Sequence, residues 1–534
     1  MTRRARCLRA AVLPVAAITL FCTSSCTYSD SNEARPSSPP GTSAAAVPPN
    51  QVSGVALPER AVEVAVGELD GLAESLMRES GIPGMAVAVV HGGKTVYSKG
   101  FGVREAGREG RVDGDTVFQL ASVSKSLAAS VVAHQVGTGA IGWDTPVVSA
   151  LPWFALDDPA VTAQVTVGDL FSHRSGLPDH AGDRLEDLGY NRTQILSRLR
   201  LEPLDPFRIS YAYTNYGLTA GAEAVAVDAG VDWEQLSQDT LYGPLGMTST
   251  SSRFADYQQR PDRAVGHMSV DGGWVAKAVR DPEAQSPAGG ASSSVNDMAR
   301  WLTMVLGEGT MGDTVIAPAK ALLPALSPQA VSSPPANPSA RAGFYGHGFN
   351  VSTTSAGRTT LSHSGAFELG AATSFLVIPS ADVAIVALTN ASPIGVPETL
   401  TAEFADILQY GEVREDWRGL YREAFAEMDQ PEGALVGVSP PADPAPARPA
   451  VDYVGSYAND YWGPATVTES DGALTLTLGP AGLRLPLKHW NGDVFTFTLE
   501  NENAPPGTIS QASFDGDALT LEYYDEDGLG TFRR

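Results

Sequence analysis

The segment "ASVSKS", residues 121–126, contains three serines and one lysine, in a chain that has only six lysines. Ser122 and Lys125 are three residues apart, so on a helix their side chains share one face and can touch. Ser124 and Ser126 adjoin the lysine in sequence and point elsewhere. A desolvated lysine can lose its proton and act as a base, which a guanidinium cannot do. The segment fits a nucleophile paired with a base, and it also fits a capped helix with an exposed lysine.

The helix that carries this pair is expected to begin at Ser122. An apolar pattern of helical period starts after Ser122 and runs to Gly137. Unpaired N–H groups and the helix dipole favour negative charge at such an N-terminus. A serine there can attack a carbonyl while its own amide N–H faces the developing oxyanion.

Two downstream stretches decide between the readings. "YAYTNYG" contains Tyr213 and Asn215, and "LSHSGAF" contains His363-Ser364-Gly365. In order and spacing, S-x-x-K, Y-x-N and H-S-G resemble the motifs of the serine β-lactamase and D,D-peptidase superfamily, in its class C β-lactamase-like branch of β-lactamase-related serine hydrolases. The segments "GIPGMAVAVVHGGKTVYSKGFGV", "LFSHRSGLPD" and "SPAGGASSSVNDMARWL" are similar to that family as well, and the resemblance covers about residues 59–425.

The resemblance implies a role for each motif residue. Ser122 would be the acyl-accepting nucleophile, Lys125 its proton-sharing partner and Tyr213 a proton relay. Substrate binding would fall to the second and third motifs, with Asn215 holding the substrate amide beside His363, Ser364 and Gly365. The oxyanion would be bound by the backbone N–H groups of Ser122 and Ala366.

His363 departs from the β-lactamase pattern, which has a lysine at that position. A neutral imidazole attracts a substrate carboxylate weakly, so efficient β-lactamase activity is not expected. We therefore predict a serine hydrolase of D-amino-acid-containing peptides or amides, either carboxypeptidase-like or aminopeptidase-like. An esterase or weak β-lactamase is the alternative. A penicillin-recognising or scaffold protein without significant turnover is an alternative of another class.

Composition limits the partners. The formal net charge of −25 argues against nucleic acid, whose phosphates need Lys and Arg. No cysteine lies beyond residue 26, and no His spacing indicates a metal site, so we expect no cofactor and no metal. The expected partner is a small peptide or ester substrate. The oligomeric state stays open.

The N-terminus predicts export. Residues 1–26 carry four arginines, a short apolar run and then small residues, as in a secretory signal peptide. Cys26, after Ser24 and Ser25, resembles the modified cysteine of a bacterial lipoprotein. We expect an extracellular protein or one anchored at the outer face of the cell membrane, with membrane contact only through such a lipid.

Two Pro-rich stretches divide the rest of the chain. Residues 27–58 are predicted to be a disordered Pro/Ser/Ala linker, 59–428 a β-lactamase-like hydrolase domain, 429–450 a second linker and 451–534 a small β-barrel domain. Turn residues at 91–94 and 379–382 predict two β-hairpins near the ends of the hydrolase domain, with helices between them. The predicted fold class is α/β (α+β), an antiparallel sheet plus a helical region, followed by the all-β barrel.

Overall fold

The computed structural model describes residues 52–534. The predicted signal peptide, Cys26 and most of the first linker lie outside the described residues. Within residues 52–534, no helix has the length and apolar character needed to cross a membrane.

An eight-stranded antiparallel sheet forms the centre of the hydrolase domain. Its order is β2-β1-β14-β13-β12-β11-β10-β9. The strands are β1 (Gly84–His91), β2 (Lys94–Gly102), β9 (Ala330–Ser333), β10 (Gly343–Tyr345), β11 (Asn350–Thr353), β12 (Thr359–Phe367), β13 (Ala371–Ile378) and β14 (Val383–Thr389). Both predicted hairpins are confirmed, as β1–β2 and β13–β14, and β1 pairs with β14. The two ends of the domain therefore meet in one sheet.

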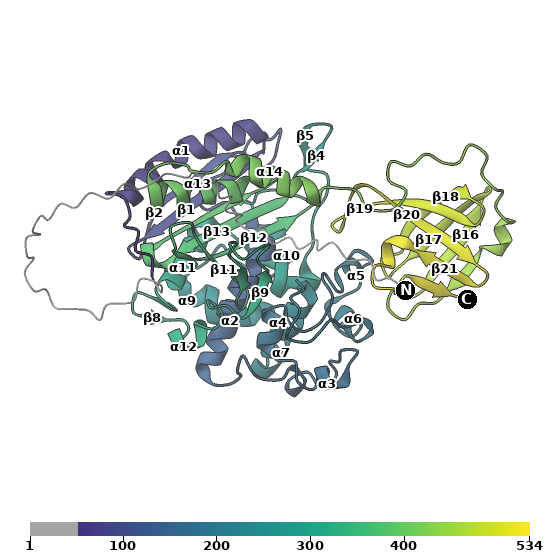
Figure 1. The fold of residues 1–534 in the computed structure, drawn as a ribbon, viewed down its shortest axis with the longest axis horizontal. Helices are drawn as coiled ribbons and strands as arrows, with labels where there is room; N and C mark the ends of the chain where they lie inside the picture. The colour runs from purple at the N-terminus through teal and green to yellow at the C-terminus, as the bar shows by residue number, and fades with distance from the viewer. Residues whose placement is uncertain (1–51) are drawn as a thin grey trace, which may run out of the picture.

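Helices cover both faces of this sheet, which explains the uninterrupted apolar sequence of β1. Alternate residues of β1 enter two different cores, Val87 in one and Ala88 in the other. On one face lie α1 (Ala61–Ser80), α13 (Val396–Tyr410) and α14 (Trp417–Met428) (Figure 1). The opposite face packs on the helical region, which includes α2 (Ser124–Thr138), α7 (Asn215–Ala229) and α11 (Val295–Leu306).

Shorter elements lie between β2 and β9 along the chain. The helices are α3 (Pro159–Thr162), α4 (Val167–Phe171), α5 (Asp183–Asp187), α6 (Arg192–Leu196), α8 (Trp233–Ser237), α9 (Gly243–Leu245), α10 (Phe254–Gln259) and α12 (Ala319–Leu322). The two-stranded pieces are β3 (Phe118–Gln119) with β6 (Ser292–Ser293), β4 (Met268–Val270) with β5 (Gly273–Val275), and β7 (Thr310–Met311) with β8 (Thr314–Val315).

The C-terminal domain is an up-and-down barrel, drawn in yellow in Figure 1. Its strands pair in chain order: β15 (Gly455–Tyr457), β16 (Ala465–Ser470), β17 (Ala473–Leu478), β18 (Leu483–Asn491), β19 (Val494–Asn501), β20 (Ala504–Asp515), β21 (Ala518–Leu521) and β22 (Thr531–Arg533). A bridge between Ala458 and Arg533 brings the first and last strands together. The predicted barrel is therefore nearly closed, as such small sheets need to be if their edges are to be protected.

The barrel and the hydrolase domain meet backbone to backbone. The N–H of Ala481 donates to the carbonyl of Leu188 at 3.1 Å. Gly189 (φ +88°) and Gly479 (φ +66°) stand at this contact in left-handed conformations. A Cβ on Gly479 would lie 2.4 Å from the Leu188 carbonyl oxygen, which real side chains do not tolerate. One hydrophobic cluster runs through both domains.

The Pro-rich stretch before the barrel is exposed yet attached to it. The N–H of Ile509 donates to the carbonyl of Glu432 at 2.9 Å, and the N–H of Gly492 donates to that of Ala445 at 2.8 Å. The stretch therefore runs along the barrel surface.

Candidate active site

Ser122 lies in a tight turn that is fixed by a hydrogen bond from the central sheet. A single 3₁₀ turn, Ala121–Val123, precedes α2, and Ala121 has a left-handed φ of +46°. The hydroxyl of Thr373, on β13, donates to the carbonyl of Leu120 at 2.7 Å. A strained residue fixed in this way next to a nucleophile is a common feature of active sites. Ser122 is partly exposed, whereas Lys125 is completely buried.

The amine of Lys125 has three hydrogen-bond partners. Nζ lies 3.0 Å from Ser122 Oγ, 2.6 Å from Asn215 Oδ1 and 3.0 Å from the carbonyl oxygen of Ala288. The last two can only accept, so each needs an N–H. Loss of one proton therefore leaves the lone pair of a neutral amine directed at Ser122.

Burial makes that proton easy to lose. Desolvation lowers the pKa of Lys125 to about 7, against the opposing charge of Asp183. At neutral pH a substantial fraction of the amine is then uncharged and can accept the proton of the Ser122 hydroxyl. Arginine could not take this role.

Tyr213 stands on the other side of the nucleophile. Its hydroxyl hydrogen-bonds with Ser122, and Lys125 Nζ lies 4.6 Å from the centre of its ring. Burial raises the pKa of Tyr213, and the hydrogen bond from Ser122 opposes that rise only in part. The phenol therefore keeps its proton and can donate it, which leaves Lys125 as the group able to accept one.

Asn215 is oriented by two residues that sequence reasoning missed. Its Nδ2 donates to Asp183 Oδ2 at 2.7 Å, and the same oxygen lies 2.7 Å from His180 Nδ1. Burial lowers the pKa of His180, but the carboxylates of Asp179 and Asp183 outweigh it and raise the pKa to about 9. A continuous chain of polar contacts thus runs from His180 through Asp183 and Asn215 to Lys125. The only sequence signal was a His and an Asp three residues apart in a loop.

His173 was also missed, and it holds the backbone around Tyr213. The N–H of Thr214 donates to its Nδ1 at 3.2 Å, and the N–H of Ala212 donates to its carbonyl at 3.0 Å. Its ring centre lies 4.6 Å from that of Tyr213. Burial and the charge of Lys125 hold the pKa of His173 well below its usual range, so the imidazole is neutral.

His363 faces the same cluster from β12, with both ring nitrogens occupied. Nε2 lies 2.8 Å from the hydroxyl of Tyr345, and Nδ1 lies 2.6 Å from the carbonyl of Ser364. Burial, followed by the charge of Lys125, lowers the pKa of His363 to about 3. The ring is neutral, and both of its nitrogens are already hydrogen-bonded within the protein, so it offers little to a substrate carboxylate.

Ser364, the next residue, points to the other side of the sheet. Its hydroxyl hydrogen-bonds with the buried carboxyl of Glu398 on α13, and burial raises the pKa of that carboxyl to about 7. The structure therefore brings His363 to the site and turns the Ser364 side chain away from it.

Gly365 and Ala366 bring β12 against the nucleophile. A Cβ on Gly365 would lie 3.0 Å from the backbone nitrogen of Ser122 and 2.2 Å from the carbonyl oxygen of Leu120, so only glycine allows this approach. In the described chain β11 pairs with β12 only as far as Ser362, which leaves the edge from His363 onward without a neighbouring strand. An extended substrate could pair with that edge next to Ser122.

The two neighbouring serines are bound to the backbone. Ser124 Oγ accepts from the N–H of Ala291 at 3.0 Å, and the Ser126 hydroxyl donates to the carbonyl of Gly348 at 2.5 Å. Both side chains are buried. Neither is available as a nucleophile.

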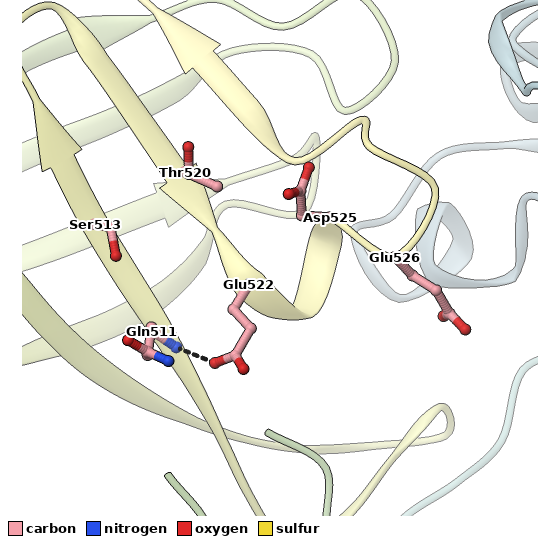
Figure 2. Close-up of a pocket in the computed structure, with 6 residues that line it drawn as sticks. All are labelled: Gln511, Ser513, Thr520, Glu522, Asp525 and Glu526. Carbon is pink, nitrogen blue, oxygen red and sulfur yellow. Dashed lines mark hydrogen bonds between the residues drawn. The ribbon is translucent and has the colours of Figure 1, made fainter. Parts of the chain in front are cut away.

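A separate pocket lies on the barrel (Figure 2). It is lined by Gln511, Ser513, Thr520, Glu522, Asp525 and Glu526. The Gln511 N–H donates to Glu522 Oε2 at 3.0 Å. Residues 52–534 contain no group of three His, Cys, Asp or Glu side chains placed to hold a metal ion.

Comparison with known proteins decides the family. The Beta-lactamase family model matches residues 69–408, more than half of the chain. The chain belongs to the β-lactamase family. The predicted resemblance is confirmed, and the protein is a serine hydrolase of the β-lactamase and penicillin-binding-protein group. A model of a domain of unknown function matches residues 439–528, which include most of the barrel.

Individual relatives agree with this assignment. Penicillin-binding protein 4 of Amycolatopsis lactamdurans is 30% identical over 392 residues, covering 70% of this chain and 92% of that protein. Unguisins hydrolase ungD of Aspergillus violaceofuscus is 25% identical over 470 residues, covering 78% and 80%. An octameric penicillin-binding protein homologue from Pyrococcus abyssi superposes with a TM-score of 0.56 at 20% identity, over 86% of this chain and 98% of that chain, which shows the shared fold alone. The predicted fold is confirmed.

Proposed function

We propose that this protein is an exported serine hydrolase that cleaves D-amino-acid-containing peptides or amides through a Ser122 acyl-enzyme. The carrying observation is the buried Lys125, whose pKa of about 7 and contact of 3.0 Å with Ser122 fit a general base. The composition of residues 1–26 supports export, and Cys26 is the proposed point of lipid attachment.

Each site residue has a role in the proposed reaction. Neutral Lys125 takes the hydroxyl proton as Ser122 Oγ attacks the substrate carbonyl carbon. The oxyanion accepts hydrogen bonds from the backbone N–H groups of Ser122 and Ala366. Tyr213 gives its proton to the leaving nitrogen or oxygen and regains one from Lys125. Water then attacks the acyl carbon and gives a proton to the same pair, which returns it to Ser122 Oγ as the bond between the acyl carbon and Oγ breaks.

His363 supports a choice among substrates. The site lacks a cation at the third motif, where a β-lactam or C-terminal carboxylate would bind, because the His363 ring is neutral and already hydrogen-bonded. This favours aminopeptidase-like cleavage of an amide over carboxypeptidase or β-lactamase activity. Simple esters, which carry no carboxylate, are the second candidate for the same reason.

A substrate panel tests the proposal. The mature protein is incubated with a fluorophosphonate, a D-amino-acid amide, a D-Ala-D-Ala peptide, a penicillin, nitrocefin and a nitrophenyl ester, and intact mass and product are followed together. We expect an adduct on Ser122 and product from the D-amino-acid amide. Ser122→Ala should abolish both, while Ser124→Ala, the matched control, should keep both. Stable adducts without product from any substrate would instead indicate a penicillin-recognising protein.

A further inference from the structure

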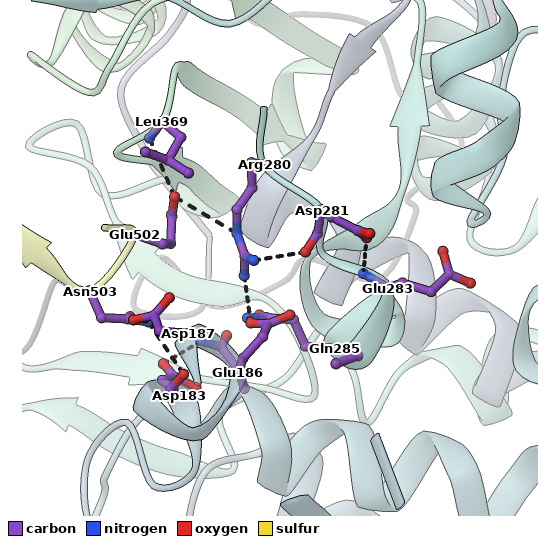
Figure 3. Close-up of polar contacts among 12 residues, drawn as sticks. Asp183, Glu186, Asp187, Arg280, Asp281, Glu283, Gln285, Leu369, Glu502 and Asn503 are labelled. Atoms are coloured by element: carbon purple, nitrogen blue, oxygen red, sulfur yellow. Dashed lines mark hydrogen bonds and ion pairs between the residues drawn. The ribbon is translucent and has the colours of Figure 1, made fainter. Parts of the chain in front are cut away.

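The turn between β19 and β20 of the barrel enters the polar region beside the active site (Figure 3). Asn501 pairs with Ala504, so the turn consists of two residues, Glu502 and Asn503. Only 11% of the Glu502 side chain is exposed. The two residues of the turn contact two different segments of the hydrolase domain, one on each side of the site.

Glu502 holds the wall that carries the proposed oxyanion donor. Its Oε1 accepts from the N–H of Glu368 at 3.2 Å, and its Oε2 accepts from the N–H of Leu369 at 3.3 Å. These amides follow Ala366 by two and three residues. Glu502 Oε2 also lies 3.7 Å from Nε of the buried Arg280, whose guanidinium lies 5.1 Å from the centre of the Phe367 ring.

Asn503 holds the opposite wall. Its Nδ2 donates to the carbonyl of Asp183 at 3.3 Å and to Asp187 Oδ2 at 2.8 Å, so it contacts both ends of the short helix α5. Asp183 is the residue whose carboxylate orients Asn215 and, through it, Lys125. The two walls are joined again by Arg280, which donates to Glu186 Oε2 at 2.6 Å.

The turn is not needed to attach the barrel. Other contacts do this, including Tyr190, whose hydroxyl donates to the carbonyl of Trp462 at 2.9 Å, and Arg198, whose Nε donates to that of Tyr461 at 3.0 Å. The barrel can therefore stay docked when the turn is altered, and the two functions of the domain can be separated.

We infer that Glu502 and Asn503 are positioning residues. Through them the barrel fixes two parts of the hydrolase site, the end of β12 that carries the oxyanion donor and the helix α5 that orients Asn215. The inference rests on the proposed function. Glu502 acts on the Ala366 N–H through the end of β12. Asn503 acts on Asn215 and the substrate amide through α5. The barrel is then part of the catalytic apparatus.

The two residues should give different kinetic signatures with a nitrophenyl ester and a D-amino-acid nitroanilide. In Glu502→Gln the side-chain NH₂ group meets a backbone N–H, so one of the two hydrogen bonds is lost. The oxyanion donor should then be displaced, which should lower kcat about tenfold for both substrates. KM should stay within about twofold. Glu502→Asp keeps a carboxyl group, whose two oxygens can accept from both backbone N–H groups, and should recover part of the loss. Asn503→Ala should raise KM for the anilide about fivefold. KM for the ester should stay nearly unchanged, because the ester lacks the amide that Asn215 holds.

Glu500→Gln is the matched control. Glu500 lies on the same hairpin and forms an exposed ion pair with Lys277 of the hydrolase domain. Its replacement should leave both constants unchanged. Melting temperatures are compared first. If Glu502→Gln is strongly destabilised, Asn503→Ala and the partial rescue by Glu502→Asp carry the test. Kinetic constants for Glu502→Gln and Asn503→Ala equal to those of Glu500→Gln would overturn the inference. Failure of the proposed function is distinct, since the unmodified protein would then form no Ser122 adduct.

Discussion

Replacing Asp183 by asparagine is expected to shift the pH dependence of Ser122 acylation to lower pH. Asp183 stabilises the ammonium form of Lys125, so its charge raises a pKa that burial lowers. Asparagine keeps an oxygen that can accept from Asn215 Nδ2 and removes only the charge. The amine should then lose its proton at lower pH.

The size of the shift follows from the geometry. Asp183 and Lys125 contact opposite ends of the Asn215 amide at 2.7 and 2.6 Å. A separation of roughly 6 Å at an effective dielectric of about 20 gives about 3 kcal/mol, or about two pH units. Asp183 also raises the pKa of His180, so its removal lets His180 lose its positive charge more readily. That loss offsets about half of the effect on Lys125, and we expect a shift of about one unit.

The assay is the pH profile of kcat/KM for a nitrophenyl ester. The half-point of the rising limb, near pH 7 in the unmodified protein, should fall to about 6 in Asp183→Asn, while the plateau at high pH changes little. His180→Gln removes a positive charge and should move the half-point in the opposite direction. A half-point that stays in place or rises in Asp183→Asn would refute Lys125 as the titrating base.

Three further substitutions test other parts of the site. Lys125→Arg should lower acylation by at least about a thousandfold, measured as the burst of nitrophenol, because a guanidinium does not deprotonate. His173 has a left-handed backbone conformation, and its ring accepts from the N–H of Thr214. His173→Leu removes this acceptor and should slow fluorophosphonate labelling. His173→Asn tolerates the conformation and keeps an acceptor, so it should retain most of the labelling. Glu398→Gln should stabilise the fold by about 2–3 kcal/mol at pH 8 and by little at pH 4, measured by urea unfolding. Burial raises the pKa of Glu398 to about 7 in the folded state, so its favourable contribution is complete below the unfolded pKa and disappears as pH rises through 7, while Gln stays neutral throughout.

The parts of the fold that were predicted are those coded over short distances in the chain. The hairpin at 91–94 combines two runs rich in β-forming residues with a Gly-Gly turn, and helical spacing predicts that Ser122 and Lys125 can touch. The order of the three motifs carried the family. Ser122 was expected at the helix N-terminus and lies one 3₁₀ turn before α2, a difference of two residues.

The parts that were not predicted depend on contacts between distant segments. Asp183 meets Asn215 across 32 residues, and Asn503 meets Asp187 across 316, with no repeated spacing to indicate either contact. The orientation of Ser364 was missed for a different reason. Strand alternation places it opposite His363, but which face of β12 meets the helical region is decided by the whole sheet.

The backbone contact at Gly189 and Gly479 bears on how the molecule unfolds. Because the two domains share one hydrophobic cluster and approach too closely for any side chain at these positions, neither can lose its structure without exposing the core of the other. A single calorimetric transition is the natural consequence. A barrel expressed from residue 451 alone would present an apolar face to water, and an alanine at Gly479 would weaken both halves of the chain together.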